Sequence, residues 1–266
     1  VDEINIGSDL KVCDVTENIS HEYKKYFQRI LRIDNLKVTS AQLDFSRVEP
    51  VERESEKHRS KNIFRTAPEL VQSYPVVENY GEGIFIAFNE NLISNHKINA
   101  TRFTRLINRD RDEFARSAVQ TAKVGDFPLF LIHSFCHLLM RELEFRCGYP
   151  TASLSERLYV SNDEGKKMYG LMIYTSEGAE GSMGGLIAQT RTANLNALFG
   201  SALARATVCQ SDPLCWESEG QGLFELNLAS CFACSLVSET SCEQRNLFLD
   251  RRIVVDDEFG FFKEVI

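Results

Sequence analysis

Several features are missing from this sequence, and each absence excludes a class of protein. No apolar run approaches the roughly 20 residues that a membrane-spanning helix needs. The first ten residues, VDEINIGSDL, are polar and acidic, unlike a secretory signal peptide, and no initiator Met precedes them. We also find no GKT or GKS phosphate loop and no DEAH-type sequence. We therefore expect a cytoplasmic protein, outside the membrane and without an ATP-driven motor of its own.

Positive charge is also scarce. The 266 residues include 30 Lys and Arg against 38 Asp and Glu, which gives a net charge of −8. A protein that coats nucleic acid needs the opposite balance, so any DNA contact must come from a local basic patch or from a partner. The chain is 43% hydrophobic, which is enough for one large domain or two small ones.

The hydrophobic pattern predicts an α/β protein with a mixed sheet and several helices. Loose alternation or apolar runs indicate strands, whereas apolar residues at helical spacing indicate helices. Asp126 can cap a long core helix that ends at Gly148, and Gly81 and Gly83 suggest a turn or a close backbone approach before a buried strand. The pattern predicts strands at 36–48, 84–88 and 168–175, and helices at 23–33, 99–123, 126–147 and 192–208.

Cysteine is the residue type whose pattern is most informative. Five of the eight cysteines fall in the segment 209–242, with the spacing C-x5-C-x15-C-x2-C-x7-C. In the absence of a signal sequence, such clustering favours a metal site over disulfides. The C-x2-C pair can bind one tetrahedral ion from a single turn. The candidate ligands are four of the five residues Cys209, Cys215, Cys231, Cys234 and Cys242.

Four thiolates would close the coordination shell, so the expected site is structural zinc and not a catalytic metal. Cys231 and Cys234 are its firmest ligands, while Cys209, Cys215 and Cys242 compete for two places. An iron–sulfur cluster and a set of buried small hydrophobes are the alternatives. Trp216 and Phe232 stand beside cysteines and are expected to pack around the metal.

Two histidines, His133 and His137, stand four residues apart on the predicted core helix, where they can face one metal ion. No glutamate sits between them as in HExxH, and their surroundings are apolar. We therefore interpret them as hydrogen-bonded core histidines rather than ligands. Cys136 lies between them, but its place in a buried helix argues against a nucleophilic role.

Candidate contacts to nucleic acid come from two basic segments and one glycine-rich turn. Each lysine or arginine could neutralise a phosphate, although we favour a solvated protein surface as the explanation for the arginines. The turn at 181–185, GSMGG, could offer backbone N–H groups to a phosphate but lacks the lysine of a P-loop. The candidates are Arg59, Lys61, Arg102, Arg105, Arg109, Ser182 and Gly184.

A series of motifs in one order resembles the MrfA zinc-binding domain, found at the C-terminus of certain DNA helicases. The resemblance extends over residues 131–253 and is closest to the DrmB-like family of DISARM antiphage systems, which GEGIFIAF at 81–88 also supports. It divides the chain into an N-terminal α/β region, 1–125, with a charged loop near 50–66, and an MrfA-type domain, 126–266. The matching pieces are HSFCHLL, GYPTASLSERLYV, GSMGG, CQSDPLC, SEGQG, CFAC and ETSCEQRNLFLDR.

The resemblance implies a non-catalytic accessory subunit of a helicase-containing antiphage defence complex. DrmB-like proteins pair with a superfamily 2 helicase, DrmA, so the expected partners are a DrmA-like helicase and, through the complex, DNA. DrmB-like proteins are considerably longer than this chain. Two alternatives stay open: a metal-dependent nuclease or other phosphoryl-transfer enzyme, and a protein–protein scaffold without DNA contact.

Overall fold

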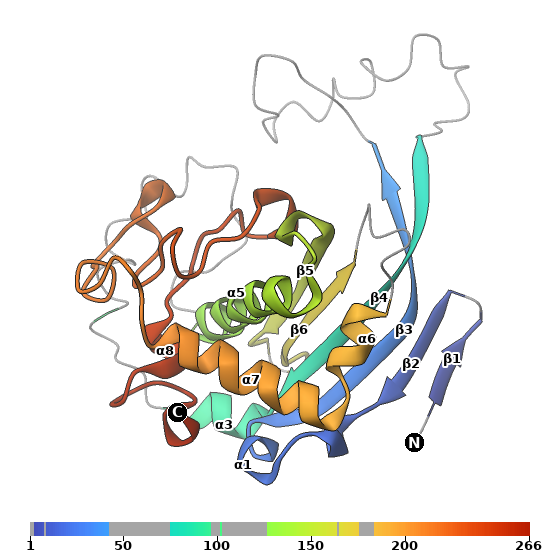
Figure 1. Ribbon diagram of the computed structural model, residues 1–266, viewed down its shortest axis with the longest axis horizontal. Helices are drawn as coiled ribbons and strands as arrows, with labels where there is room; N and C mark the ends of the chain where they lie inside the picture. Colours follow the sequence, from blue (N-terminus) through green and yellow to red (C-terminus); the bar gives the residue numbers. More distant parts are fainter. Residues whose placement is uncertain are drawn as a thin grey trace.

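The computed structural model describes residues 3–7, 9–42, 75–96, 102, 127–163, 165–175 and 184–266. One curved sheet forms the right side of the molecule, and helices pack against its inner face (Figure 1). The C-terminal third lies mostly in loops beyond the other end of the central helix (Figure 1). Within the described ranges, none of the helices combines the length and apolar character needed to cross a membrane.

The sheet has six strands in the order β1-β2-β3-β4-β6-β5. The sequence pattern indicated a mixed sheet, but each neighbouring pair of these strands is antiparallel. Strands on both sides of residue 125 contribute to it, and the division into two domains at that point stays a prediction. The strands are β1 Glu3–Ile6, β2 Leu10–Asp14, β3 Phe27–Ala41, β4 Val76–Phe88, β5 Leu154–Ser161 and β6 Met168–Thr175.

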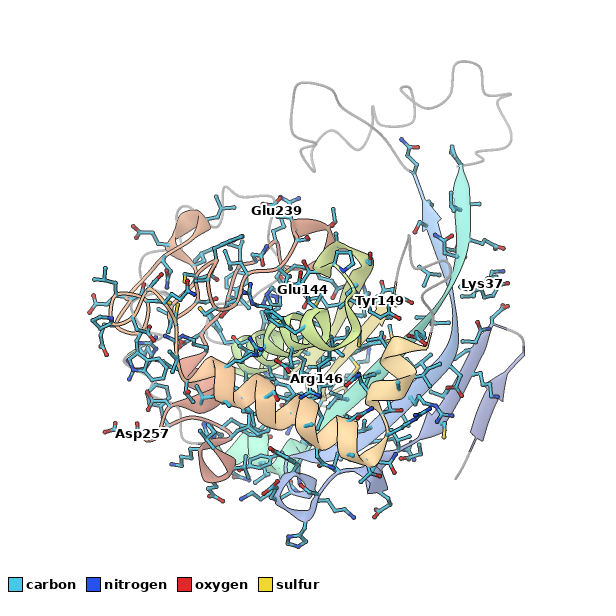
Figure 2. The ribbon with its side chains drawn as sticks, viewed as in Figure 1. Lys37, Glu144, Arg146, Tyr149, Glu239 and Asp257 are labelled. Atoms are coloured by element: carbon cyan, nitrogen blue, oxygen red, sulfur yellow. The ribbon has the colours of Figure 1, made fainter. Side chains whose placement is uncertain are left out.

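Helix α5, Phe127–Cys147, is the centre of the core, and sixteen of its residues are buried. It packs against β5, β6 and the helix α7, Thr192–Ala206. Arg146 joins the two helices, because its guanidinium donates to Ala197 O at 2.9 Å and to Ser201 Oγ at 2.9 Å (Figure 2). The shorter helices are α1 His21–Lys24, α3 Glu90–Asn95, α6 Gly185–Gln189 and α8 Arg252–Val255.

Two predicted features of the sheet are confirmed and one is wrong. The strands expected at 84–88 and 168–175 both form, although β4 begins earlier, at Val76, so that Gly81 and Gly83 lie within it. The expected close approach is present, because a Cβ on Gly83 would lie 2.9 Å from Ile173 O of β6. The helix expected at 23–33 is instead β3, after the single turn α1. Register shifts at 27–29 and 33–36 break the alternation of that strand, so every third residue is buried and the pattern resembles a helix.

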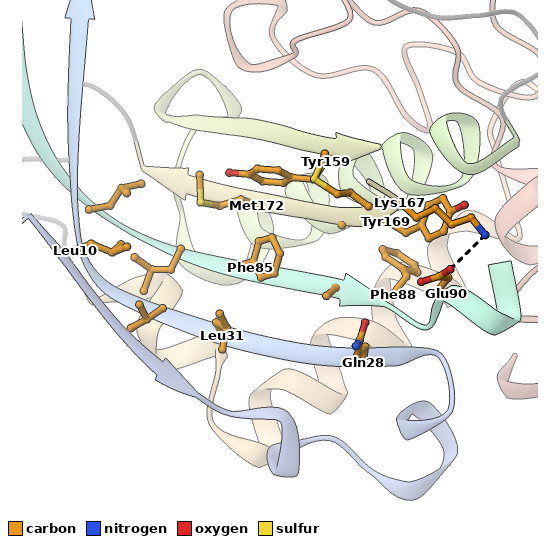
Figure 3. A pocket seen from close by; sticks show the side chains of 16 residues that line it. Leu10, Gln28, Leu31, Phe85, Phe88, Glu90, Tyr159, Lys167, Tyr169 and Met172 are labelled. Atoms are coloured by element: carbon orange, nitrogen blue, oxygen red, sulfur yellow. Dashed lines mark ion pairs between the residues drawn. The ribbon is translucent and has the colours of Figure 1, made fainter. Parts of the chain in front are cut away.

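The outer face of the sheet, opposite α5, carries an apolar hollow of about 500 Å³ (Figure 3). Successive side chains of a strand point to opposite faces. Ile84 and Ile86 of β4 therefore enter the core, whereas Phe85 lines the hollow with Tyr159 and Met172. An ion pair between Lys167 and Glu90, 3.4 Å apart, closes one end (Figure 3).

Candidate metal centre

Four of the five candidate cysteines converge at the loop-rich end of the molecule. The sulfurs of Cys209, Cys215, Cys231 and Cys234 all lie within 4.8 Å of one another, and we call them the four-cysteine centre. Three neighbouring pairs are 3.5, 3.8 and 3.8 Å apart. A tetrahedral zinc ion with Zn–S bonds near 2.3 Å requires sulfur–sulfur edges of about 3.8 Å, so the spacing fits this ion.

The chain segments around the sulfurs have the hydrogen bonds that thiolates need. Cys231 N donates to Cys234 Sγ at 3.2 Å, and Ser211 N donates to Cys209 Sγ at 3.4 Å. Ser235 Oγ adds a donor to Cys234 at 3.3 Å. A hydrogen bond from the Cys215 thiol lowers the pKa of Cys234 to about 5 and raises the pKa of Cys215. The backbone and hydroxyl donors would therefore stabilise thiolates at Cys209 and Cys234, whereas burial raises the pKa of the Cys209 thiol.

Two arginines fix the cysteine-bearing segments in place. Arg251 is fully buried; it donates to Ala206 O at 2.8 Å and pairs with Asp212, between Cys209 and Cys215. Arg141, on α5, donates to the carbonyls of the 231–236 turn, including Leu236 O at 2.9 Å. Both place positive charge near a centre that has a formal charge of about −2 when four thiolates bind Zn²⁺.

The predicted packing of two aromatic rings beside the cysteines is only half right. The ring of Trp216 packs under the Arg251 guanidinium, with 4.5 Å between the guanidinium carbon and the ring centroid. Phe232, in contrast, is 82% exposed. It lies at the tip of the C-x2-C turn, which projects into solvent, so its expected packing around the metal is wrong.

Cys242 lies elsewhere, although its place in the sequence made it a competitor for the metal. Its sulfur is 3.2 Å from His133 Nε2, in the core. A second group of potential ligands forms there from His133 and His137 of α5, Glu156 of β5 and Cys242. Burial acts to raise the pKa of Glu156, but its interactions with the rings of His133 and His137 hold this pKa well below its usual value, and burial lowers the pKa of His133.

Two of the nucleic-acid candidates, Arg102 and Gly184, lie within the described ranges. The polar groups proposed to contact phosphate are in both cases bonded to carboxylates of the protein itself. The Arg102 guanidinium bonds both Asp250 carboxylate oxygens, at 2.8 and 3.1 Å. Gly184 N donates to the buried carboxylate of Glu82 at 2.7 Å, and Leu186 N does the same. An internal carboxylate thus occupies the place that a phosphate would take at this turn. Arg59, Lys61, Arg105, Arg109 and Ser182, and the charged loop near 50–66, lie outside the described residues.

A set of four cysteines with no open coordination position, on an α/β scaffold, defines a domain that binds structural zinc. Residues 135–235 match the family described as the MrfA Zn-binding domain, which confirms the resemblance seen in the motifs. The chain is also 32% identical, over 259 residues and 94% of its length, to "DISARM protein DrmB" of Bacillus paralicheniformis (strain ATCC 9945a / NCIMB 11709 / CD-2). It spans 45% of the length of that relative.

Sequence reasoning did not single out Glu156, Arg141 or Arg251. No strand or helix was expected around Glu156. The apolar alternation of Leu154, Leu158 and Val160, with Glu156 in the same period, is a signal that could have found it, because a carboxylate enters a core only with partners. The arginines carry no comparable signal. Their roles depend on carbonyls and carboxylates that the fold brings close from distant parts of the chain.

Proposed function

We propose that this chain is a zinc-stabilised, non-catalytic accessory subunit of an antiphage defence complex, and that it docks a superfamily 2 helicase resembling DrmA. The similarity to a DISARM protein along 94% of the chain carries the proposal. The four-cysteine centre supports the non-catalytic role, since four thiolates leave no position for water or substrate.

The zinc region also supplies a surface suited to a protein partner. Val208, Leu214 and Phe232 are exposed by 70%, 84% and 82%, although all three are large and apolar. Each is the chain neighbour of a metal-binding cysteine, so all three belong to the segments that surround the four-cysteine centre. Exposed apolar groups held on a rigid support are typical of protein contact sites, with aromatic residues contributing most. We assign the helicase contact to this apolar tip, defined as Val208, Leu214 and Phe232.

The test is the affinity of the chain for the helicase encoded with it. We expect the double change Leu214→Ser and Phe232→Ser to weaken binding by about tenfold or more, because hot-spot side chains dominate interfaces. Zinc content and unfolding temperature should stay unchanged, since both residues are exposed. Val77→Ser removes an equally apolar, 56% exposed group at the far end of β4 and serves as the control. A wild-type chain that does not bind the helicase would refute the proposed role.

DNA contact is proposed to arise in the complex and not in this chain alone, given its net charge of −8. The chain should raise the DNA affinity of the helicase. This gain in affinity should fall as the salt concentration rises, more steeply the more phosphates the chain contacts. A gain that is zero at all salt concentrations would favour the scaffold alternative. Mg²⁺-dependent DNA cleavage by the purified chain would instead favour the nuclease alternative.

A further inference from the structure

A second cluster of metal-ligand side chains lies wholly within the core. His133 and His137 are 0% exposed, Glu156 is 2% exposed and Cys242 is 7% exposed. One potential ligand atom from each lies within 4.8 Å of the other three. His133 Nε2 is 3.2 Å from both Glu156 Oε1 and Cys242 Sγ, and His137 Nε2 is 3.5 Å from Glu156 Oε2.

Hydrogen bonds inside the protein do not account for this cluster. Among the described residues, His137 Nε2 and Glu156 Oε2 have no hydrogen-bond partner, although both atoms are fully buried and point at each other. Burying a polar group without a partner costs about 1–3 kcal/mol, and more when the group is charged. Two imidazoles, a carboxylate and a thiol in a site without solvent therefore require something further that all four can bind.

The surrounding hydrogen bonds orient three of the four side chains as ligands. His137 Nδ1 donates to Ser235 O at 3.0 Å, which places the proton on Nδ1 and leaves the Nε2 lone pair directed at the cluster. Glu243 N donates to Glu156 Oε1 at 3.0 Å, and Asn246 N donates to Cys242 Sγ at 3.1 Å. Such outer partners are the usual companions of metal ligands, since they fix tautomer and direction.

We propose that His133, His137, Glu156 and Cys242 bind a second zinc ion. Zinc accepts nitrogen, oxygen and sulfur ligands in tetrahedral geometry, which requires neighbouring ligand atoms about 3.3–3.7 Å apart. The separations of 3.2, 3.2 and 3.5 Å are close to this requirement, with the two shorter ones just below it. The two histidines are one helical turn apart, so α5 presents both to the same point. With four buried protein ligands the site is structural, and it replaces our initial interpretation of the pair as core histidines.

The second zinc would join two elements that are close in sequence to a segment much later in the chain. Its ligands come from α5, from β5 at the edge of the sheet, and from the segment that follows the short 3-10 helix Glu239–Ser241. Ser235, which accepts the hydrogen bond from His137, directly follows Cys234 of the four-cysteine centre. The second ion would thus connect the edge of the sheet to the region of that centre.

Metal analysis of the full chain tests the proposal. Wild-type protein dialysed against a weak chelator should retain two zinc ions per chain. We expect one in the variant Cys231→Ser/Cys234→Ser and one in the variant His137→Gln/Glu156→Gln. Cys13→Ala is the control, because Cys13 is a buried thiol on β2 that belongs to neither group of ligands, and this variant should retain two.

X-ray absorption at the zinc edge keeps the test decisive even where a variant fails to fold. The folded wild-type protein should show a mixed first shell averaging about 2.5 sulfurs and about 1.5 nitrogen or oxygen atoms, with distances near 2.3 and 2.05 Å. The Cys231→Ser/Cys234→Ser protein should show mainly nitrogen and oxygen. One zinc per wild-type chain with an all-sulfur shell would overturn the proposal, because it would leave the buried cluster without metal.

Discussion

The two groups of potential metal ligands in this chain differ in ligand type, in burial and in how the sequence encodes them. The four-cysteine centre takes all its ligands from one segment of the chain, 209–234, and two of its cysteines are partly exposed. The buried cluster draws on α5, β5 and a late loop, and water reaches none of its ligands freely. The first organises a local loop region that has little other regular structure, whereas the second lies where distant elements meet.

Helix α5 connects the two regions. His133 and His137 face the buried cluster, and Arg141, one further turn along, bonds the carbonyls of the C-x2-C turn. These three positions are each four residues apart, so they share one face of the helix. A single helical face therefore aligns both groups, and a change in the position of α5 would affect the two together.

The largest effect outside the ligands themselves is expected from Arg251→Met, which should affect the four-cysteine centre alone. Removing the guanidinium leaves Asp212 and Ala206 O without their buried partner. Breaking one side of a buried ion pair costs about 3–5 kcal/mol. Denaturant unfolding would measure this loss, and a chelator assay should show faster release of zinc from the all-cysteine site.

Arg157→Met is the matched control for Arg251→Met, since Arg157 pairs with Glu243 but is 60% exposed. Exposed pairs contribute about 0–1 kcal/mol, so this variant should be close to wild type. Equal stability losses for the two variants would show that Arg251 does not specifically support the four-cysteine centre.

A smaller effect is expected from Arg141→Ala, which removes the bonds between α5 and the C-x2-C turn. The three carbonyls of this turn are partly exposed and can bond to water instead, so the loss should be about 1–2 kcal/mol. Arg141→Lys keeps the charge but not the planar fork and should fall between wild type and Arg141→Ala. Hydrogen exchange at residues 231–236 gives the measurement. Unchanged protection in Arg141→Ala would mean that the two regions are not linked through this side chain.

The sequence predicts an element well when the hydrophobic pattern of its segment is regular, and poorly when a register shift or a buried polar residue interrupts that pattern. The continuous apolar faces of α5 and β6 predict both elements with the right bounds, and α7 is predicted within two residues. In β3, two register shifts replace the two-residue period with one close to helical. In β5, Glu156 occupies an inward position, so the alternation that would reveal the strand is interrupted.

The same distinction applies to the candidate site. Metal ligands that are close in sequence have a characteristic spacing, which is why the C-x2-C pair could be identified from the sequence. Cys242 and the two histidines carry no such spacing relative to Glu156, because their proximity depends on β5 pairing with β6 at the edge of the sheet. The choice among five cysteines likewise depends on tertiary structure, in which Cys242 turns toward α5.

The smallest effect concerns acid sensitivity that belongs to neither group of ligands. His96 follows α3; its Nε2 donates to Phe259 O at 2.8 Å, and its ring stacks on Phe127 with 5.0 Å between centroids. Burial lowers the pKa of this imidazole below 6.5; the Phe259 carbonyl opposes that shift, and the charge of Lys263 adds to it. As the pH falls, the unfolded chain therefore takes up the proton first. The stabilising contribution is complete above about pH 6.5 and is lost between there and the lower folded pKa.

His96→Gln keeps a donor for Phe259 O but removes the titration. In zinc-loaded protein, the loss of unfolding free energy between about pH 7 and pH 5 should be smaller in this variant by less than about 1 kcal/mol, because the ring is only partly buried. The pH dependence that remains in the variant then reports on the rest of the molecule, including proton competition for the metal ligands. Identical pH slopes in the two proteins would show that His96 is not responsible, and that the acid sensitivity arises elsewhere in the chain.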